Sequence, residues 1–120
     1  MTIRTGNYDL MIIQGATLDE TFTWKDSAGV AVNLTGYTAR MQIRNERGGA
    51  TLYETLTTVP TEGITLGGAA GTIRIERTPV QTGAYTFERG VYDIELTVTA
   101  TGVVTRLIEG AVVVSRQVTV

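Results

Sequence analysis

The most constraining feature of this chain is a regular alternation of apolar and polar residues in three separate runs. In YTARMQIR, residues 37–44, every second side chain from Tyr37 onward is apolar. The run VYDIELTVT, residues 91–99, alternates in the same way, and TLDETFTWK, residues 17–25, does so with one interruption at Glu20. A period of two residues is typical of a β-strand with one buried face, and none of these runs has helical spacing. The sequence therefore predicts an all-β protein.

Short turn sequences separate the predicted strands, as a sandwich or a small barrel requires. Turn-forming residues occur at positions 26–29, 47–49 and 101–102. The segment GITLGGAAGTIRIE predicts a hairpin with strands at residues 64–66 and 72–76 and a glycine-rich tip. The stretch TPVQTGAYTFERG has no clear period and leaves room for a single helical turn.

The chain is predicted to form one immunoglobulin-like antiparallel β-sandwich domain over residues 1–120. It has 120 residues and shows neither an internal repeat nor a linker. Tyr92 stands at the start of a long late strand, where a tyrosine corner occurs in such sandwiches. The side chains of Phe22, Trp24, Tyr37 and Tyr92 are expected in the core. Whether Tyr53 and Tyr85 face the core or the solvent stays open.

Charged residues are expected to pair across the outer surface of this sandwich. If the strands at residues 37–44 and 91–99 are neighbours, Arg40 and Arg44 face Asp93 and Glu95. Cross-strand pairs of this kind stabilise a sheet by roughly 0.2–1 kcal/mol each and help to fix its register.

Composition excludes several kinds of partner and chemistry. The chain has 10 Lys plus Arg against 12 Asp plus Glu, a net charge of −2, so it lacks the basic surface that nucleic acid or an anionic membrane requires. It has no cysteine and no histidine, which excludes disulfides, thiolates and imidazole ligands for metals. The apolar run Leu10 to Ile13 is far too short to span a membrane. We therefore expect no cofactor, no metal site, no nucleic-acid partner and no membrane partner.

The best candidates for catalysis are the carboxylates of Asp93 and Glu95. They lie on one strand face, roughly 7 Å apart, which is within reach of the spacing in an inverting glycosidase. A catalytic pair also needs a cleft and a raised pKa, whereas an exposed strand face with charge partners explains the two residues more simply. Ser27 and Ser115 have no histidine to act as their base. The sequence therefore predicts that the protein is not an enzyme.

Three long segments resemble a known family. They are QGATLDETFTWKDSAGVAVNLTGYTARMQIR, EGITLGGAAGTIRI and GVYDIELTVTATGVVTRLIEGAVVVS. Together, from about Tyr8 to Val114, they are similar to small structural proteins of bacteriophages and to the N-terminal domain of phage baseplate upper proteins. The markers of the resemblance are Trp24-Lys25-Asp26, Leu34-Thr35-Gly36-Tyr37, Gly63-Ile64, Gly71-Thr72-Ile73, Tyr92-Asp93-Ile94 and Glu109-Gly110. Each marker is a turn or core feature, so the set indicates a fold rather than a site.

The resemblance implies a structural component of the virion, made in the host bacterial cytoplasm, that docks onto tail or baseplate proteins. A baseplate upper protein continues into a linker and a second domain, whereas this sequence ends at Val120, which favours a compact adaptor. Its expected partners are other phage structural proteins, and regular strands suit a subunit assembled in multiple copies by symmetry. Two alternatives stay open: a capsid decoration or head-fibre protein, and a carbohydrate-binding module that recognises the host surface.

The predicted contact surface combines the C-terminal stretch VVTRLIEGAVVVSRQVTV with YDLMIIQ near the N-terminus. Both stretches carry apolar residues on both faces, more than a solvent-facing edge usually shows. The alternative is that they pair with each other inside the sheets, because continuous apolar runs also mark strands buried on both sides. The predicted contact residues are Leu107, Ile108, Val112, Val114, Ile12 and Ile13, of which Leu107 and Val112 are expected to face outward.

Overall fold

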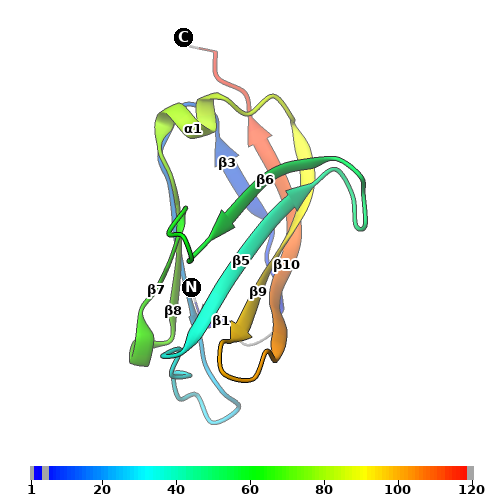
Figure 1. Ribbon diagram of the computed structural model, residues 1–120. Coiled ribbons are helices and arrows are strands. Elements are labelled where there is room, and N and C mark those ends of the chain that lie inside the picture. Colours follow the sequence, from blue (N-terminus) through cyan, green and yellow to red (C-terminus); the bar gives the residue numbers. More distant parts are fainter. Residues whose placement is uncertain (1, 4–5, 119–120) are drawn as a thin grey trace.

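Two β-sheets packed face to face make up the protein (Figure 1). The computed structural model describes residues 2–3 and 6–118, with side chains from residue 6 onward. The first sheet has the order β1-β4-β8-β7, and the second has the order β2-β10-β9-β5-β6 with β3 also pairing with β10. The first sheet contains β1 (Thr2–Ile3), β4 (Leu18–Trp24), β8 (Thr72–Arg77) and β7 (Ile64–Leu66). The second contains β2 (Gly6–Asn7), β3 (Leu10–Ile13), β10 (Val104–Ser115), β9 (Arg89–Val98), β5 (Tyr37–Arg44) and β6 (Leu52–Thr57).

This strand order is that of an immunoglobulin-like sandwich. Strands β1, β4, β8 and β7 take the places of strands A, B, E and D, while β10, β9 and β5 take those of G, F and C. All neighbouring strands are antiparallel except β1, β2 and β3, which run parallel to their partners. The predicted fold class is therefore confirmed.

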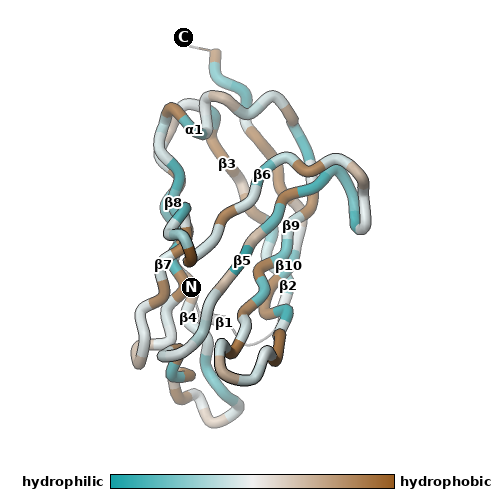
Figure 2. Tube along the Cα trace, in the orientation of Figure 1, coloured by the Kyte–Doolittle hydropathy of each residue, from teal (hydrophilic) through white to brown (hydrophobic). Residues whose placement is uncertain are grey.

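The alternation seen in the sequence builds the core between the sheets. In β5, Ala39, Met41 and Ile43 are buried, and in β9 every second residue from Tyr92 to Leu96 is buried. Figure 2 shows the corresponding change between hydrophobic and hydrophilic positions along these strands. Phe22 is fully buried on the opposite sheet, whereas Trp24 and Tyr37 are half-buried against the core. The predicted strands are confirmed, and two of the four expected core aromatics lie at the margin of the core.

The segments between β6 and β9 follow their turn chemistry. The predicted hairpin is formed by β7 and β8, with a 3₁₀ turn over Gly68–Ala70 at its tip. The expected single helical turn is α1 (Pro79–Gly83), and it begins with a capping box. In this box the Thr78 hydroxyl accepts from the Gln81 amide at 3.2 Å, and the Gln81 side chain accepts from the Thr78 amide at 2.9 Å. Within the described part of the chain, no helix is long and apolar enough to cross a membrane.

Tyr92 does not form the tyrosine corner that its position predicts. In such a corner the hydroxyl bonds to the backbone a few residues upstream, but here it donates to the carbonyl oxygen of Tyr8. The Tyr8 segment is within reach because it lies against β10, where the Tyr8 amide donates to the Glu109 carbonyl at 2.9 Å. A Cβ atom on Gly110 would stand only 2.2 Å from the Tyr8 oxygen, so glycine permits this approach. Tyr92 thus fastens the N-terminal segment to the second sheet.

Candidate functional site

The predicted contact surface is wrong for five of its six residues. Leu107, Ile108, Val112, Val114 and Ile12 are at most 3% exposed. Strand β10 is flanked by β9 on one side and by β2 and β3 on the other, so its inner face belongs to the core. A β-bulge between Arg106 and Ile108 shifts the register and turns two consecutive residues, Leu107 and Ile108, inward. The bulge explains why this run is apolar at both odd and even positions.

The alternative interpretation of these stretches, that they pair with each other, is confirmed. Strand β3 runs parallel to β10, with Leu10 opposite Val112 and Ile12 opposite Val114. The N-terminal and C-terminal strands lie side by side in Figure 1. The outward positions of β3 differ, because Met11 is 61% exposed and Ile13 is 58% exposed. Of the six predicted contact residues, only Ile13 is therefore available to a partner.

Strand β3 forms one border of the second sheet, and we call its four residues, 10–13, the β3 edge. Among the described residues, β3 pairs with β10 alone. Natural edge strands are usually protected by a charge, a proline or a bulge. The β3 edge has none of these, and the whole stretch LMIIQGATL, residues 10–18, is uncharged.

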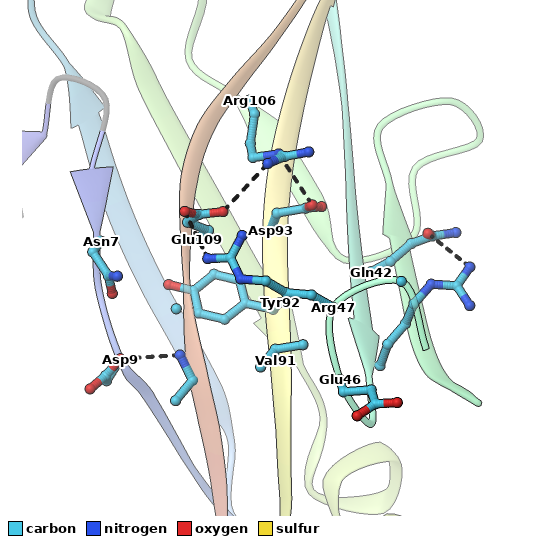
Figure 3. Close-up of a pocket in the computed structure, with 14 residues that line it drawn as sticks. Asn7, Asp9, Gln42, Glu46, Arg47, Val91, Tyr92, Asp93, Arg106 and Glu109 are labelled. Carbon is cyan, nitrogen blue, oxygen red and sulfur yellow. Dashed lines mark hydrogen bonds and ion pairs between the residues drawn. The ribbon is translucent and has the colours of Figure 1, made fainter. Parts of the chain in front are cut away.

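A polar groove lies on the outer face of the second sheet (Figure 3). Its volume is about 370 Å³, and it runs between β10 and the loop of residues 45–51 that joins β5 to β6. The strand alternation brings Gln42 and Asp93 to this face, where the two residues are opposite each other. Val91 is opposite Ala111 in the same groove. Sequence reasoning found Asp93 but missed the groove, because the path of the loop determines it.

The loop is fastened to the sheet by charged contacts. Arg47 crosses above β9 and places its Nη2 atom 2.9 Å from the Oε1 atom of Glu109 on β10. The hydrogen bond and charge of Arg47 lower the pKa of Glu109. At the base of the loop, the Arg44 guanidinium donates to the carbonyl of Gly49 at 3.1 Å and to the side-chain oxygen of Gln42 at 3.3 Å. These contacts hold the loop as a wall of the groove.

Asp93 on the groove floor is incompletely paired. Its nearest cation is Arg106, whose Nε atom is 3.6 Å from the Asp93 Oδ2 atom and which also approaches Glu109 at 3.6 Å. Within residues 6–118, no N–H or O–H group donates a hydrogen bond to this carboxylate. Burial, followed by the charge of neighbouring Glu95, raises the pKa of Asp93. The carboxylate therefore has acceptor capacity that the described protein does not use.

The expected charge pairs are confirmed for one arginine and wrong for the other. Arg40 is opposite Glu95, and their side chains approach to 3.4 Å. The same antiparallel register puts Arg44 opposite Val91, so Arg44 does not meet Asp93. Arg106, on the other side of β9, is the arginine that approaches Asp93. Of the two carboxylates of the catalytic hypothesis, Asp93 thus lies on the groove floor beside Arg106, whereas Glu95 lies outside the groove beside Arg40.

A second polar cluster lies between the sheets at one end of the sandwich. Arg77, only 4% exposed, ends β8 at an inward position. Its Nη1 atom donates to Glu62 at 2.7 Å, and its Nε atom is 3.6 Å from Glu54 on β6. The hydroxyl of buried Tyr85 donates to the same Glu54 carboxylate at 2.8 Å. Ile73, Ile75 and Arg77 are at alternate positions of β8 and therefore share its inward face. This spacing in the sequence predicts a buried arginine, which the sequence analysis missed.

For Tyr53 and Tyr85 the sequence did not decide between a core and a surface position. Both lie inside or at the border of the cluster around Arg77. Tyr85 is 7% exposed, and half-buried Tyr53 stacks on Phe87 with ring centroids 4.2 Å apart. The one aromatic residue that lines the groove, Tyr92, is 3% exposed, so the groove presents no open ring for stacking. In the described residues, no group of three or more acidic side chains is arranged to hold a metal ion.

Comparison of the sequence with protein-family models gives no match, and comparison with curated proteins gives none either.

Proposed function

We propose that this protein is a non-enzymatic structural subunit of a bacteriophage virion, an adaptor associated with the tail or baseplate that acts through protein–protein contacts. The resemblance to phage structural proteins supplies the setting. The observation that carries the proposal is the β3 edge, an apolar and uncharged strand at the border of the second sheet whose outward side chains, Met11 and Ile13, are exposed.

An exposed edge strand is suited to one kind of partner. Its free backbone groups can hydrogen-bond to an extended strand of another chain, and its alternate side chains supply apolar contacts. On the β3 edge those side chains are Met11 and Ile13, beside half-buried Val113, which is opposite Met11. A subunit repeated by symmetry would present this edge in every copy. The β3 edge thus supports an assembly role.

Two other functions would use different surfaces or locations. A capsid decoration protein would bind the head through the same edge, so the position on the particle separates it from a tail adaptor. A carbohydrate-binding module would use the groove, which offers planar polar side chains such as Asn7 and Gln42 but no open aromatic ring. A glycan array with the purified domain tests that function directly.

Labelling of virions tests the adaptor proposal. An antibody raised against this chain is applied to purified particles of the parent phage and located by electron microscopy. We expect label at the tail end or baseplate. Label spread over the head would establish decoration in its place, and intact particles without label, although their denatured proteins react on a blot, would show that the epitope is enclosed. Absence of the chain from particles by mass spectrometry would overturn the proposal.

A further inference from the structure

The groove on the outer face of the second sheet offers a second contact site, independent of the β3 edge. We propose that it binds an arginine side chain of a partner protein, with Asp93 as the carboxylate that receives the guanidinium. The inference builds on the proposed function, because it assigns the adaptor a chemically defined contact.

The unused acceptor capacity of Asp93 favours a ligand that donates hydrogen bonds. An ionised carboxylate offers about four lone-pair sites, and buried or half-buried acceptors in proteins are usually satisfied. Here Nε of Arg106, the arginine atom that forms the ion pair, lies at 3.6 Å, too far for a good hydrogen bond. The Asp93 side chain is 37% exposed and faces the groove, so a ligand can reach it from solvent. An arginine offers two parallel N–H groups that match such a carboxylate.

The charge of the groove favours a cationic ligand. Four carboxylates line it against three guanidinium groups, and each of these arginines already has a partner in the protein. Of the four carboxylates, Asp9 and Glu46 form no ion pair with any described residue. The charged groups that act on Asp93 are Glu95 on its own strand, Arg40 on β5, Arg106 and Glu109 on β10, and Arg47 on the loop. Burial is the main cause that raises the pKa of Asp93, and the carboxylate of Glu95 raises it further, while Arg106 and Arg40 act in the opposite direction.

The groove floor combines the carboxylate of Asp93 with apolar side chains. Val91 precedes Asp93 by two residues on the same face of β9, roughly 7 Å away, and Ala111 is opposite Val91. An arginine that places its guanidinium on Asp93 can lay its aliphatic stem on these two apolar side chains. The loop that carries Arg47 encloses the groove on one side. The floor therefore matches both parts of an arginine side chain.

Nuclear magnetic resonance tests this site with a minimal ligand. The ¹⁵N-labelled domain is titrated at low salt with the capped peptide acetyl-Gly-Arg-Gly-amide, and separately with the same peptide containing citrulline, the neutral isostere of arginine. We expect saturable shifts of the amides of Gln42, Val91 and Ala111 with the arginine peptide, and at least tenfold weaker binding of the citrulline peptide. Lowering the pH through the pKa of Asp93 should weaken the binding of the arginine peptide, because the protonated carboxyl loses its charge.

Two variants assign the effect to one carboxylate. Asp93→Asn should weaken the binding of the arginine peptide at least tenfold. Asp19→Asn should leave binding unchanged, because Asp19 is paired with Arg74 on the other sheet. The amide spectrum of each variant reports its folding. Equal binding of the two peptides, unchanged binding by Asp93→Asn, or no shifts in the groove would each overturn the inference. Virion labelling is unaffected by these outcomes, so the failure of this inference and the failure of the adaptor proposal are separate results.

Discussion

The hydroxyl of Tyr92 donates a hydrogen bond to the backbone carbonyl of Tyr8, a residue 84 positions earlier in the chain. This bond joins the central strand β9 to the N-terminal segment that leads into β3. Burial, with the nearby charges of Tyr8, Asp9 and Glu20, raises the pKa of Tyr92, so the hydroxyl remains a donor throughout the physiological pH range. We therefore expect the hydroxyl oxygen of Tyr92 to contribute measurably to holding the β3 edge in position.

Replacement of Tyr92 by phenylalanine removes only that oxygen. We expect the free energy of unfolding to fall by about 1–2 kcal/mol, because the partly buried carbonyl of Tyr8 loses its partner while the ring of Tyr92 still fills the core. Urea denaturation followed by tryptophan fluorescence measures the change. Tyr37→Phe is the matched control, since the Tyr37 hydroxyl donates no hydrogen bond within the described residues, and it should alter stability little. Equal effects of the two substitutions would contradict a role for the Tyr8 contact.

Replacement of Arg77 by methionine tests the cluster between the sheets. The variant leaves Glu54 and Glu62 without their buried cation, so we expect a loss of about 3 kcal/mol in the free energy of unfolding. Arg74→Met on the same strand is the control, because Arg74 is about half exposed and its ion pair with Asp19 lies in solvent. Chemical denaturation of both variants should show a large shift of the midpoint for the first and a small one for the second. A similar shift for both would mean that Arg77 acts merely as a surface cation.

Two aspartates should affect stability in opposite directions. The pKa of Asp93 is raised from 3.8 in the folded protein, so its ionisation destabilises the fold as the pH rises through that region. The pKa of Asp19 is lowered by its hydrogen bonds from Arg74, so its ionisation stabilises the fold, and that stabilisation is lost as the pH falls below about 3.8. At pH 7 we therefore expect Asp93→Asn to raise the melting temperature and Asp19→Asn to lower it. Both differences should shrink at acid pH, and changes of the same sign at pH 7 would refute this assignment.

The double substitution Met11→Lys and Ile13→Lys tests the β3 edge. Both side chains are mostly exposed, so the variant should keep the melting temperature of the parent within a few degrees. Two charges on the edge should block the addition of another strand, and we expect the protein to be lost from assembled particles in complementation experiments. Val80→Lys, at an 83% exposed position on α1, should be incorporated normally. Normal incorporation of the double variant would exclude the edge as the assembly contact.

The strands were readable from the sequence because a period of two residues with one buried face leaves a direct pattern, as in β5 and β9. The bulge in β10 was not readable, since a single extra residue changes which positions face the core without altering composition. For the same reason Leu107 and Ile108 had the pattern of a surface and proved to be core. The groove depends on where a loop lies above a neighbouring strand, and a contact such as Arg47 with Glu109 joins residues that no local pattern connects.

The parallel pairing of β3 with β10 also has a consequence for biosynthesis. Leu10 finds its partner, Val112, only after the chain has been made as far as β10, and β10 itself occupies the interior of the second sheet. Contacts between residues so far apart in sequence slow folding. A chain made only as far as β9 cannot complete this sheet, so the β3 edge takes its final form only once β10 is present.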